Sequence, residues 1–460
     1  MPDPTPALLP VPASLALVGA LLVVARGAAQ AALRRRVVGA DAARRAVQAA
    51  GSGVALLLPW LFDAAWPVVG LAAVLTVGLV AARRRSVVAV AGLDAPSTGS
   101  VAFPASVAAL YVLTAGQPVL YAIPLLLVGL AGPAASFAGT RRGRTPFATV
   151  DGTKSREGSL AFAVVAFVCV HVPLLLFTPV GRGESLAIAA VVAALATALE
   201  AVSWRGLDVL VVPLGTYVLL LRLLTFSGAV LAGHVAGLVA IAAAAALLRR
   251  ETTVGGAGVV AAALVAYAVW AVGGTAYLLP PAVVFLLYAR AWPVAREADG
   301  LPHSPARRPH TAANVFSVSA VSLLWMVAAR VLGVDLLVPY ALAWAVAFAF
   351  LGVERMRAAR PAWGVRALAV RAAWRSALVA VAPVALVWAL RVAAGTPAAP
   401  AQAGLRVVAL AALALAATSA AAVLLARFSD EIDYGTSDAG GRLARAAIVA
   451  PLSALGLLLV

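Results

Sequence analysis

The stretch GSLAFAVVAFVCVHVPLLLFT, residues 158–178, decides the fold class of this chain. It carries no Asp, Glu, Lys or Arg, and as a helix it is long enough to cross the roughly 30 Å of hydrocarbon in a membrane. Similar apolar runs recur from residue 8 to residue 460. Across the chain, 63% of residues are apolar and 12% are charged, against about 45–50% and about 25% in soluble domains.

We therefore predict an all-α fold, a polytopic transmembrane helical protein with about 14–16 spans. Backbone groups in lipid must bond internally, which leaves helices or closed barrels, and no run shows the alternation of a barrel strand. Residues 53–63 are among the expected spans. Residues 118–138 are another, and their prolines and glycines, including Pro118, Gly129 and Pro133, predict a discontinuous helix that lines a polar cavity.

Basic residues gather between alternate spans when the amino terminus is placed outside the membrane. Short loops rich in basic residues mark the cytoplasmic side, so this topology predicts an integral protein of a prokaryotic plasma membrane, with the loop 139–157 in the cytoplasm. The net charge of +17 is dispersed over the inner loops with little aromatic interleaving. That pattern fits attraction to an anionic membrane surface and argues against a nucleic-acid partner.

A polar segment, DGTKSREGS at residues 151–159, enters the apolar run and contains the only lysine among 35 basic residues. Arginine supplies positive charge everywhere else, so the single ammonium indicates a need for a compact, point-like donor. Nearby glycines allow close backbone approach, and hydroxyls lie where the next helix begins. We predict that a nucleotide binds at Gly139, Gly143, Lys154, Ser155 and Ser159. The alternative is a short basic connection that only follows the charge rule for membrane loops.

Three carboxylates, Glu157, Glu200 and Asp208, reach the same membrane face in this topology. Ionisable groups at the edge of a span are costly unless they face a cavity or a partner. Hard oxygen ligands suit Mg²⁺ on a nucleotide, so we predict that these three residues bind a divalent cation. The alternative pairs Glu200 and Asp208 with Arg205 in ordinary loop salt bridges.

Five stretches of the first half share their order and spacing with a known family: RRAVQAAGSG (44–53), GPAAS (132–136), GTRRGR (139–144), KSREGSLAF (154–162), and EAVS, GLD and VP within 200–213. They resemble the phytol kinase and dolichol kinase family, over about residues 40–225. That family is similar in turn to the membrane cytidylyltransferases that make activated phospholipid.

The resemblance implies an integral-membrane kinase that transfers the terminal phosphate of a nucleotide, with CTP expected, to a long-chain isoprenoid alcohol such as phytol or dolichol. Lys154 would hold phosphates, with Ser155 and Ser159 adding hydroxyl contacts. Glu157, Glu200 and Asp208 would bind Mg²⁺ or orient the alcohol, and the resemblance makes Lys154, Glu157 and Asp208 the catalytic residues. Phosphoryl transfer needs mainly positioning and charge neutralisation, which such a set supplies.

Three positions depart from the family pattern. Pro133 stands where an acidic residue is usual, Gln48 where histidine is usual, and Val209 where asparagine often follows the aspartate. Loss of a carboxylate and of a proton carrier puts metal binding and base assistance in doubt. The alternatives are therefore a degenerate, non-catalytic membrane protein, a transporter, or an enzyme similar to phosphatidate cytidylyltransferase.

The second half has no comparable polar loop, and we divide the chain into a kinase-like domain, 1–225, and a second helical membrane module, 226–460. Residues 224–237, 277–285 and 310–316 resemble membrane proteins of the phytyl-phosphate kinase type. The acidic segment expected of that type is missing from residues 341–354, so we predict no second active site.

Overall fold

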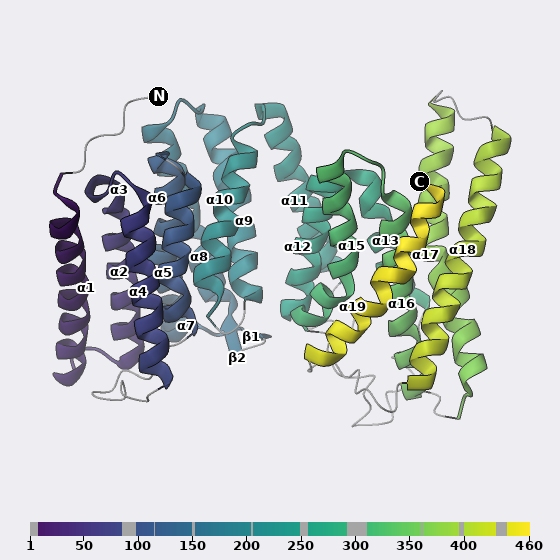
Figure 1. The fold of residues 1–460 in the computed structure, drawn as a ribbon, viewed down its shortest axis with the longest axis horizontal. Coiled ribbons are helices and arrows are strands. Elements are labelled where there is room, and N and C mark those ends of the chain that lie inside the picture. The colour runs from purple at the N-terminus through teal and green to yellow at the C-terminus, as the bar shows by residue number, and fades with distance from the viewer. Residues whose placement is uncertain are drawn as a thin grey trace. The chain divides into compact units, whose positions relative to one another are not determined.

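The computed structural model describes residues 8–84, 98–114, 116–149, 152–203, 206–248, 256–291, 311–359, 362–394, 400–428 and 439–460. Nearly all of them are helical (Figure 1). Among them, twelve helices are long and apolar enough to cross a membrane, and the helices Thr98–Thr114 and Thr275–Tyr288 are apolar but shorter. The prediction of an all-α polytopic transmembrane fold is confirmed.

The chain folds as two compact units, residues 1–239 and 240–460. The helices of the first unit are α1 (Val11–Arg34), α2 (Ala40–Leu56), α3 (Leu58–Leu61), α4 (Ala65–Arg84), α5 (Thr98–Thr114), α6 (Pro118–Leu126), α7 (Gly132–Arg142), α8 (Arg156–Phe177), α9 (Arg182–Val202) and α10 (Asp208–Leu223). Helix α11 (Gly228–Leu248) crosses the boundary between the units.

Residues 53–63 do not form the separate span that we predicted. Helix α2 ends at Leu56, and the single turn α3 then runs from Leu58 to Leu61 with proline in its first turn. Proline lacks the N–H that would continue the hydrogen-bond ladder, so the helix restarts there. Leu58, Leu61 and Phe62 of this region are buried, while Leu57 and Trp60 are exposed.

The predicted break in residues 118–138 is instead a wide turn within one continuous helix. Helices α6 and α7 are joined by a π-helical turn, η2 (Leu127–Ala131), and residues 118–142 form a single candidate span. The Gln48 side-chain amide of α2 donates to the carbonyl of Val128 at 3.4 Å. A Cβ added at Gly129 would lie 2.6 Å from the Cβ of Ser52. The glycine therefore allows α2 to pack closely against the turn.

The predicted polar loop from Gly139 to Lys154 is largely ordered secondary structure. Helix α7 continues to Arg142, and a hairpin of β1 (Pro146–Thr149) and β2 (Gly152–Ser155) follows. The strands are antiparallel and place Lys154 opposite Phe147. The hairpin lies at the end of the first unit where α7 ends and α8 begins (Figure 1).

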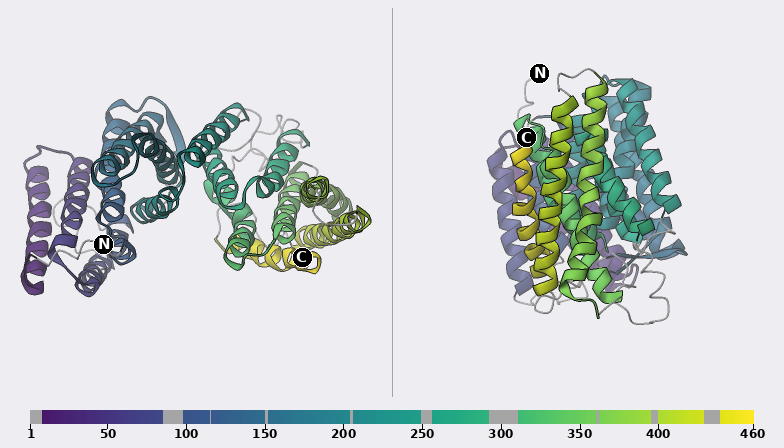
Figure 2. Two further views of the ribbon diagram at one scale, coloured as in Figure 1. Left: turned by 90° about the horizontal axis from the view of Figure 1, so that it is seen from above. Right: turned by 90° about the vertical axis from the view of Figure 1, so that its right-hand side faces the viewer.

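The second unit contains α12 (Gly256–Gly273), α13 (Thr275–Ala291), α15 (Ala312–Leu332), α16 (Leu337–Ala359), α17 (Val365–Ala393), α18 (Pro400–Phe428), α19 (Ala439–Ala454) and the 3₁₀ turn η6 (Leu455–Leu459). Helix α16 forms the core of this unit. Helices α13, α15, α17, α18 and α19 pack around it, and 89% of the residues in Leu337–Glu354 are buried. Helices α17 and α18 run side by side along their lengths (Figure 2). His310, part of one resemblance in this half, lies outside the described residues.

Candidate functional site

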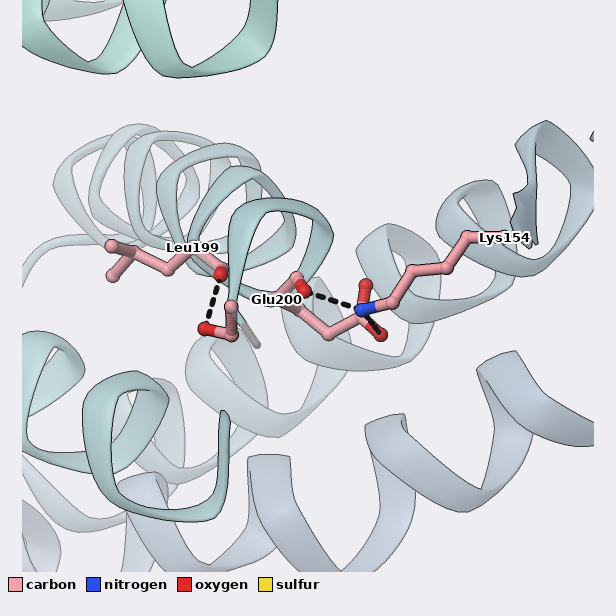
Figure 3. A network of polar contacts seen from close by, with 4 residues as sticks. Lys154, Leu199 and Glu200 are labelled. Atoms are coloured by element: carbon pink, nitrogen blue, oxygen red, sulfur yellow. Dashed lines mark hydrogen bonds and ion pairs between the residues drawn. The ribbon is translucent and has the colours of Figure 1, made fainter. Parts of the chain in front are cut away.

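Strand β2 carries Lys154 to the carboxyl-terminal end of α9. The Lys154 ammonium donates to Oε1 of Glu200 at 2.6 Å and also to the Glu200 backbone carbonyl (Figure 3). The two side chains are 28% and 15% exposed. The last carbonyls of a helix lack partners and carry the negative end of its dipole, so a cation is stabilised there. Lys154 therefore closes the end of α9 and fastens the hairpin to it.

This geometry gives a physical reason for the single lysine. One ammonium reaches the backbone carbonyl and the carboxylate of the same residue, Glu200, with separate N–H groups. A planar guanidinium presents its donors in a fixed fork, which suits a carboxylate alone better than this pair of acceptors. In the same last turn, the Leu199 carbonyl, labelled in Figure 3, accepts the Ser203 hydroxyl at 2.6 Å.

Ser155 is the N-cap of α8, and its hydroxyl accepts the Gly158 N–H at 3.1 Å. The glycines that we assigned to the nucleotide face this side chain. A Cβ at Gly139 would lie 3.1 Å from the Ser155 Oγ, and a Cβ at Gly143 would lie 3.1 Å from the Ser155 Cβ. Their closeness lets the end of α7 pack against the start of α8. Ser155 therefore occupies the space beside Gly139 and Gly143, where we expected the nucleotide to approach the backbone. At the start of α8, the Gly158 N–H already has Ser155 as its acceptor.

Glu157 is held apart from the other carboxylates by Thr145. The Thr145 hydroxyl donates to Oε1 of Glu157 at 2.8 Å, and its backbone N–H donates to Oε2 at 3.3 Å. These bonds tie the connection between α7 and β1 to the first turn of α8. Ser159, also in that turn, is half-buried. Thr145 was not among the predicted site residues, because only the folded hairpin brings it to Glu157.

Asp208 is the first residue of α10 and is half-buried. It lies within electrostatic range of Glu200. The turn before it needs glycine: Gly206 has φ +73°, and a Cβ on Gly99 of α5 would lie 2.7 Å from its carbonyl oxygen. Lys154 of β2 and Glu200 of α9 are thus in contact at one end of the first unit, and Asp208 of α10 lies within electrostatic range of that pair. Arg205, the partner in the salt-bridge alternative, lies outside the described residues.

The predicted metal ligands are not assembled. Within the described part of the chain, no three His, Cys, Asp or Glu side chains are grouped so that they could hold a metal ion. Glu157 instead binds Thr145, and Glu200 binds Lys154. A resident cation held by Glu157, Glu200 and Asp208 together does not fit this arrangement.

The structure shows the environment of each residue that departs from the family pattern, Gln48, Pro133 and Val209. Gln48 binds the Val128 carbonyl at the π-helical turn. Pro133 follows the π-helical turn and has no N–H to donate to the helix ladder, and Val209 is buried in α10. Comparison with known proteins gives no matching family model, no matching characterised protein and no matching solved structure.

Proposed function

We propose that this protein is an integral-membrane phosphotransferase that moves the terminal phosphate of a nucleotide, with CTP as the expected donor, to a long-chain isoprenoid alcohol. The observation that carries the proposal is the Lys154–Glu200 ion pair at one end of a membrane bundle, with Asp208 within electrostatic range of Glu200. An ammonium beside two carboxylates, at the edge of lipid-exposed helices, offers both a phosphate contact and a proton acceptor. The resemblance of residues 40–225 to phytol and dolichol kinases supports the same chemistry.

In the proposed reaction, the hydroxyl oxygen of the alcohol attacks the terminal phosphorus of the nucleotide. The bond from that phosphorus to the bridging oxygen breaks, which leaves the nucleoside diphosphate, and the hydroxyl proton passes to Asp208. Lys154 would exchange its Glu200 partner for phosphate oxygens and neutralise their charge. Glu157 would act by positioning, since its bonds to Thr145 hold the hairpin against α8.

Magnesium enters this proposal as part of the substrate. Mg²⁺ on a nucleotide keeps several waters and takes one or two carboxylates together with phosphate oxygens, so a resident site of three carboxylates is not required. Glu200 and Asp208 are the residues within reach of such a complex at Lys154. The alcohol would reach them sideways from the lipid, on the side of a prokaryotic plasma membrane that the basic loops mark as cytoplasmic.

The test is transfer of label from the terminal phosphate of CTP, and separately of ATP, to phytol, geranylgeraniol and dolichol by the purified protein. We expect labelled lipid phosphate that Lys154→Ala abolishes and that Arg391→Ala leaves unchanged. Arg391 is a matched control because its ion pair with Asp335 is also 2.6 Å long and lies in the second unit. No labelled lipid with any pair would overturn the proposal. Label from the α-phosphate in lipid would instead identify a cytidylyltransferase.

A second candidate function is that of a non-catalytic membrane protein, and one observation favours it. Each of Lys154, Ser155 and Glu157 already has a partner within the protein. On that account the bonds of this segment only hold α7, α8 and α9 together. The two accounts differ in whether the protein binds the nucleotide. A segment with only a structural role does not bind Mg·CTP, so calorimetry with Mg·CTP and no alcohol separates them.

A further inference from the structure

Three exposed arginines lie at one end of the second unit, Arg366 and Arg371 near the start of α17 and Arg427 near the end of α18. Helix α17 has 29 residues. At about 1.5 Å per residue it is roughly 44 Å long, against about 30 Å of hydrocarbon, so it must extend into the headgroup layer. The question is which part of α17 does so.

The charges of α17 fix its depth. Near its far end, Arg391 binds Asp335 at 2.6 Å, and both side chains are about half exposed. Residues 376–390 carry no charge. Arg371 lies twenty residues before Arg391, a rise of about 30 Å, which equals the thickness of the hydrocarbon layer. With Arg391 at one boundary, Arg371 lies at the other and Arg366 lies beyond it, at the depth of lipid phosphates.

Helix α18 brings Arg427 to the same depth. The Thr418 hydroxyl donates to the Ala373 carbonyl at 3.1 Å, which fixes the register of the two helices. From that bond, Arg366 lies about 10 Å along α17 and Arg427 about 14 Å along the antiparallel α18. Arg371 lies only about 3 Å from the bond, so the three arginines extend over about 11 Å, from the hydrocarbon boundary into the headgroup layer. We call them the α17–α18 basic patch.

Aromatic side chains accompany the patch. The Arg371 guanidinium stacks 4.4 Å from the Trp363 ring centroid, and Trp374 is 49% exposed. Tryptophan is enriched where membranes meet water, and stacking holds a guanidinium in place for a second partner. The described residues of this unit include two carboxylates, Asp335 and Glu354, and these bind Arg391 and Arg445. Neither one neutralises the patch.

We propose that the α17–α18 basic patch binds the phosphate of an anionic phospholipid. A guanidinium matches a phosphate in a bidentate fork, and arginines that extend from the hydrocarbon boundary into the headgroup layer fit a lipid phosphate better than a soluble anion. Each surface arginine is expected to contribute roughly a fivefold preference for anionic over neutral lipid. This site lies in the second unit and does not depend on the proposed transfer reaction.

The test uses the full-length protein, stripped of lipid in a neutral detergent and offered equal amounts of phosphatidylglycerol and phosphatidylcholine, with the retained lipids identified by native mass spectrometry. We expect preferential retention of phosphatidylglycerol, and a loss on the order of 100-fold in the triple variant Arg366→Gln, Arg371→Gln, Arg427→Gln. The control triple Arg182→Gln, Arg330→Gln, Arg406→Gln removes the same charge from exposed arginines elsewhere and should retain the lipid. Inorganic phosphate should not compete.

Equal retention of both lipids by the wild type would overturn the proposal, as would equal losses in the two triple variants. Competition by inorganic phosphate would also overturn it, because the patch would then be a site for soluble anions. If the glutamine triple does not fold, the triple of lysines at the same positions keeps the charge. That variant should retain phosphatidylglycerol, and its failure to do so while folded would contradict the proposal.

Discussion

Replacing Lys154 by alanine should loosen the hairpin more than it destabilises the rest of the protein. The change removes a 2.6 Å ion pair and a second bond to a helix-end carbonyl, and it leaves the Glu200 carboxylate, 15% exposed, without its cation. Breaking a fully buried pair from one side costs about 3–5 kcal/mol, while exposed pairs contribute about 0–1 kcal/mol. For side chains 28% and 15% exposed we expect an intermediate cost of about 2 kcal/mol.

Hydrogen–deuterium exchange measures this cost where it arises, because local opening of a hairpin has its own free energy. A cost of about 2 kcal/mol corresponds to roughly 30-fold faster exchange of amides in residues 146–155. Glu200→Gln should accelerate them too, and the double variant should be no worse than the first alone, since the partners share one interaction. Exchange within about threefold of the wild type in Lys154→Ala, or strictly additive effects in the double variant, would refute the claim that the Lys154–Glu200 ion pair holds the hairpin on α9.

Three further changes test the packing. Gly143→Ala should destabilise the protein by about 1–3 kcal/mol, because the new Cβ would meet a backbone carbonyl, while Gly19→Ala, with no atom nearby, should not; thermal unfolding in detergent compares them. Ser155→Ala should cost about 1 kcal/mol through the lost N-cap of α8, seen as faster exchange in its first turn, and an unchanged rate would contradict the capping role. Arg445→Ala should lower the melting temperature more than Lys154→Ala does, since the Arg445 side chain is 10% exposed against 28% for Lys154; a smaller decrease would count against this ranking.

The helices could be predicted from the sequence because lipid imposes a simple rule on composition. The run 158–178 became α8, Arg156–Phe177. The hairpin could not be predicted, because residues 146–155 mix proline, threonine and glycine over strands of four residues. The π-helical turn was also beyond reach, since the same prolines and glycines suit a broken helix or a widened one.

The candidate site was predictable in its residue types but not in its contacts. The isolated lysine and the carboxylates at span edges identified Lys154, Glu200 and Asp208, which the fold brings to one place. The partner of Lys154 lies 46 residues away, and a bond to a backbone carbonyl leaves no trace in a sequence. The same limit explains why Glu157 was assigned to a metal, when its oxygens bind Thr145.

The most direct test of the central claim, that Lys154 serves a phosphate as well as the hairpin, is the charge-reversed variant Lys154→Glu, Glu200→Lys. Its hairpin exchange and its transfer of terminal phosphate from CTP to geranylgeraniol should be measured on one preparation beside the wild type. We predict that reversal restores much of the hairpin protection lost in Lys154→Ala but none of the transfer, because the ammonium then lies on α9. Transfer that recovers together with the protection, or wild-type protein that transfers nothing, would contradict the account.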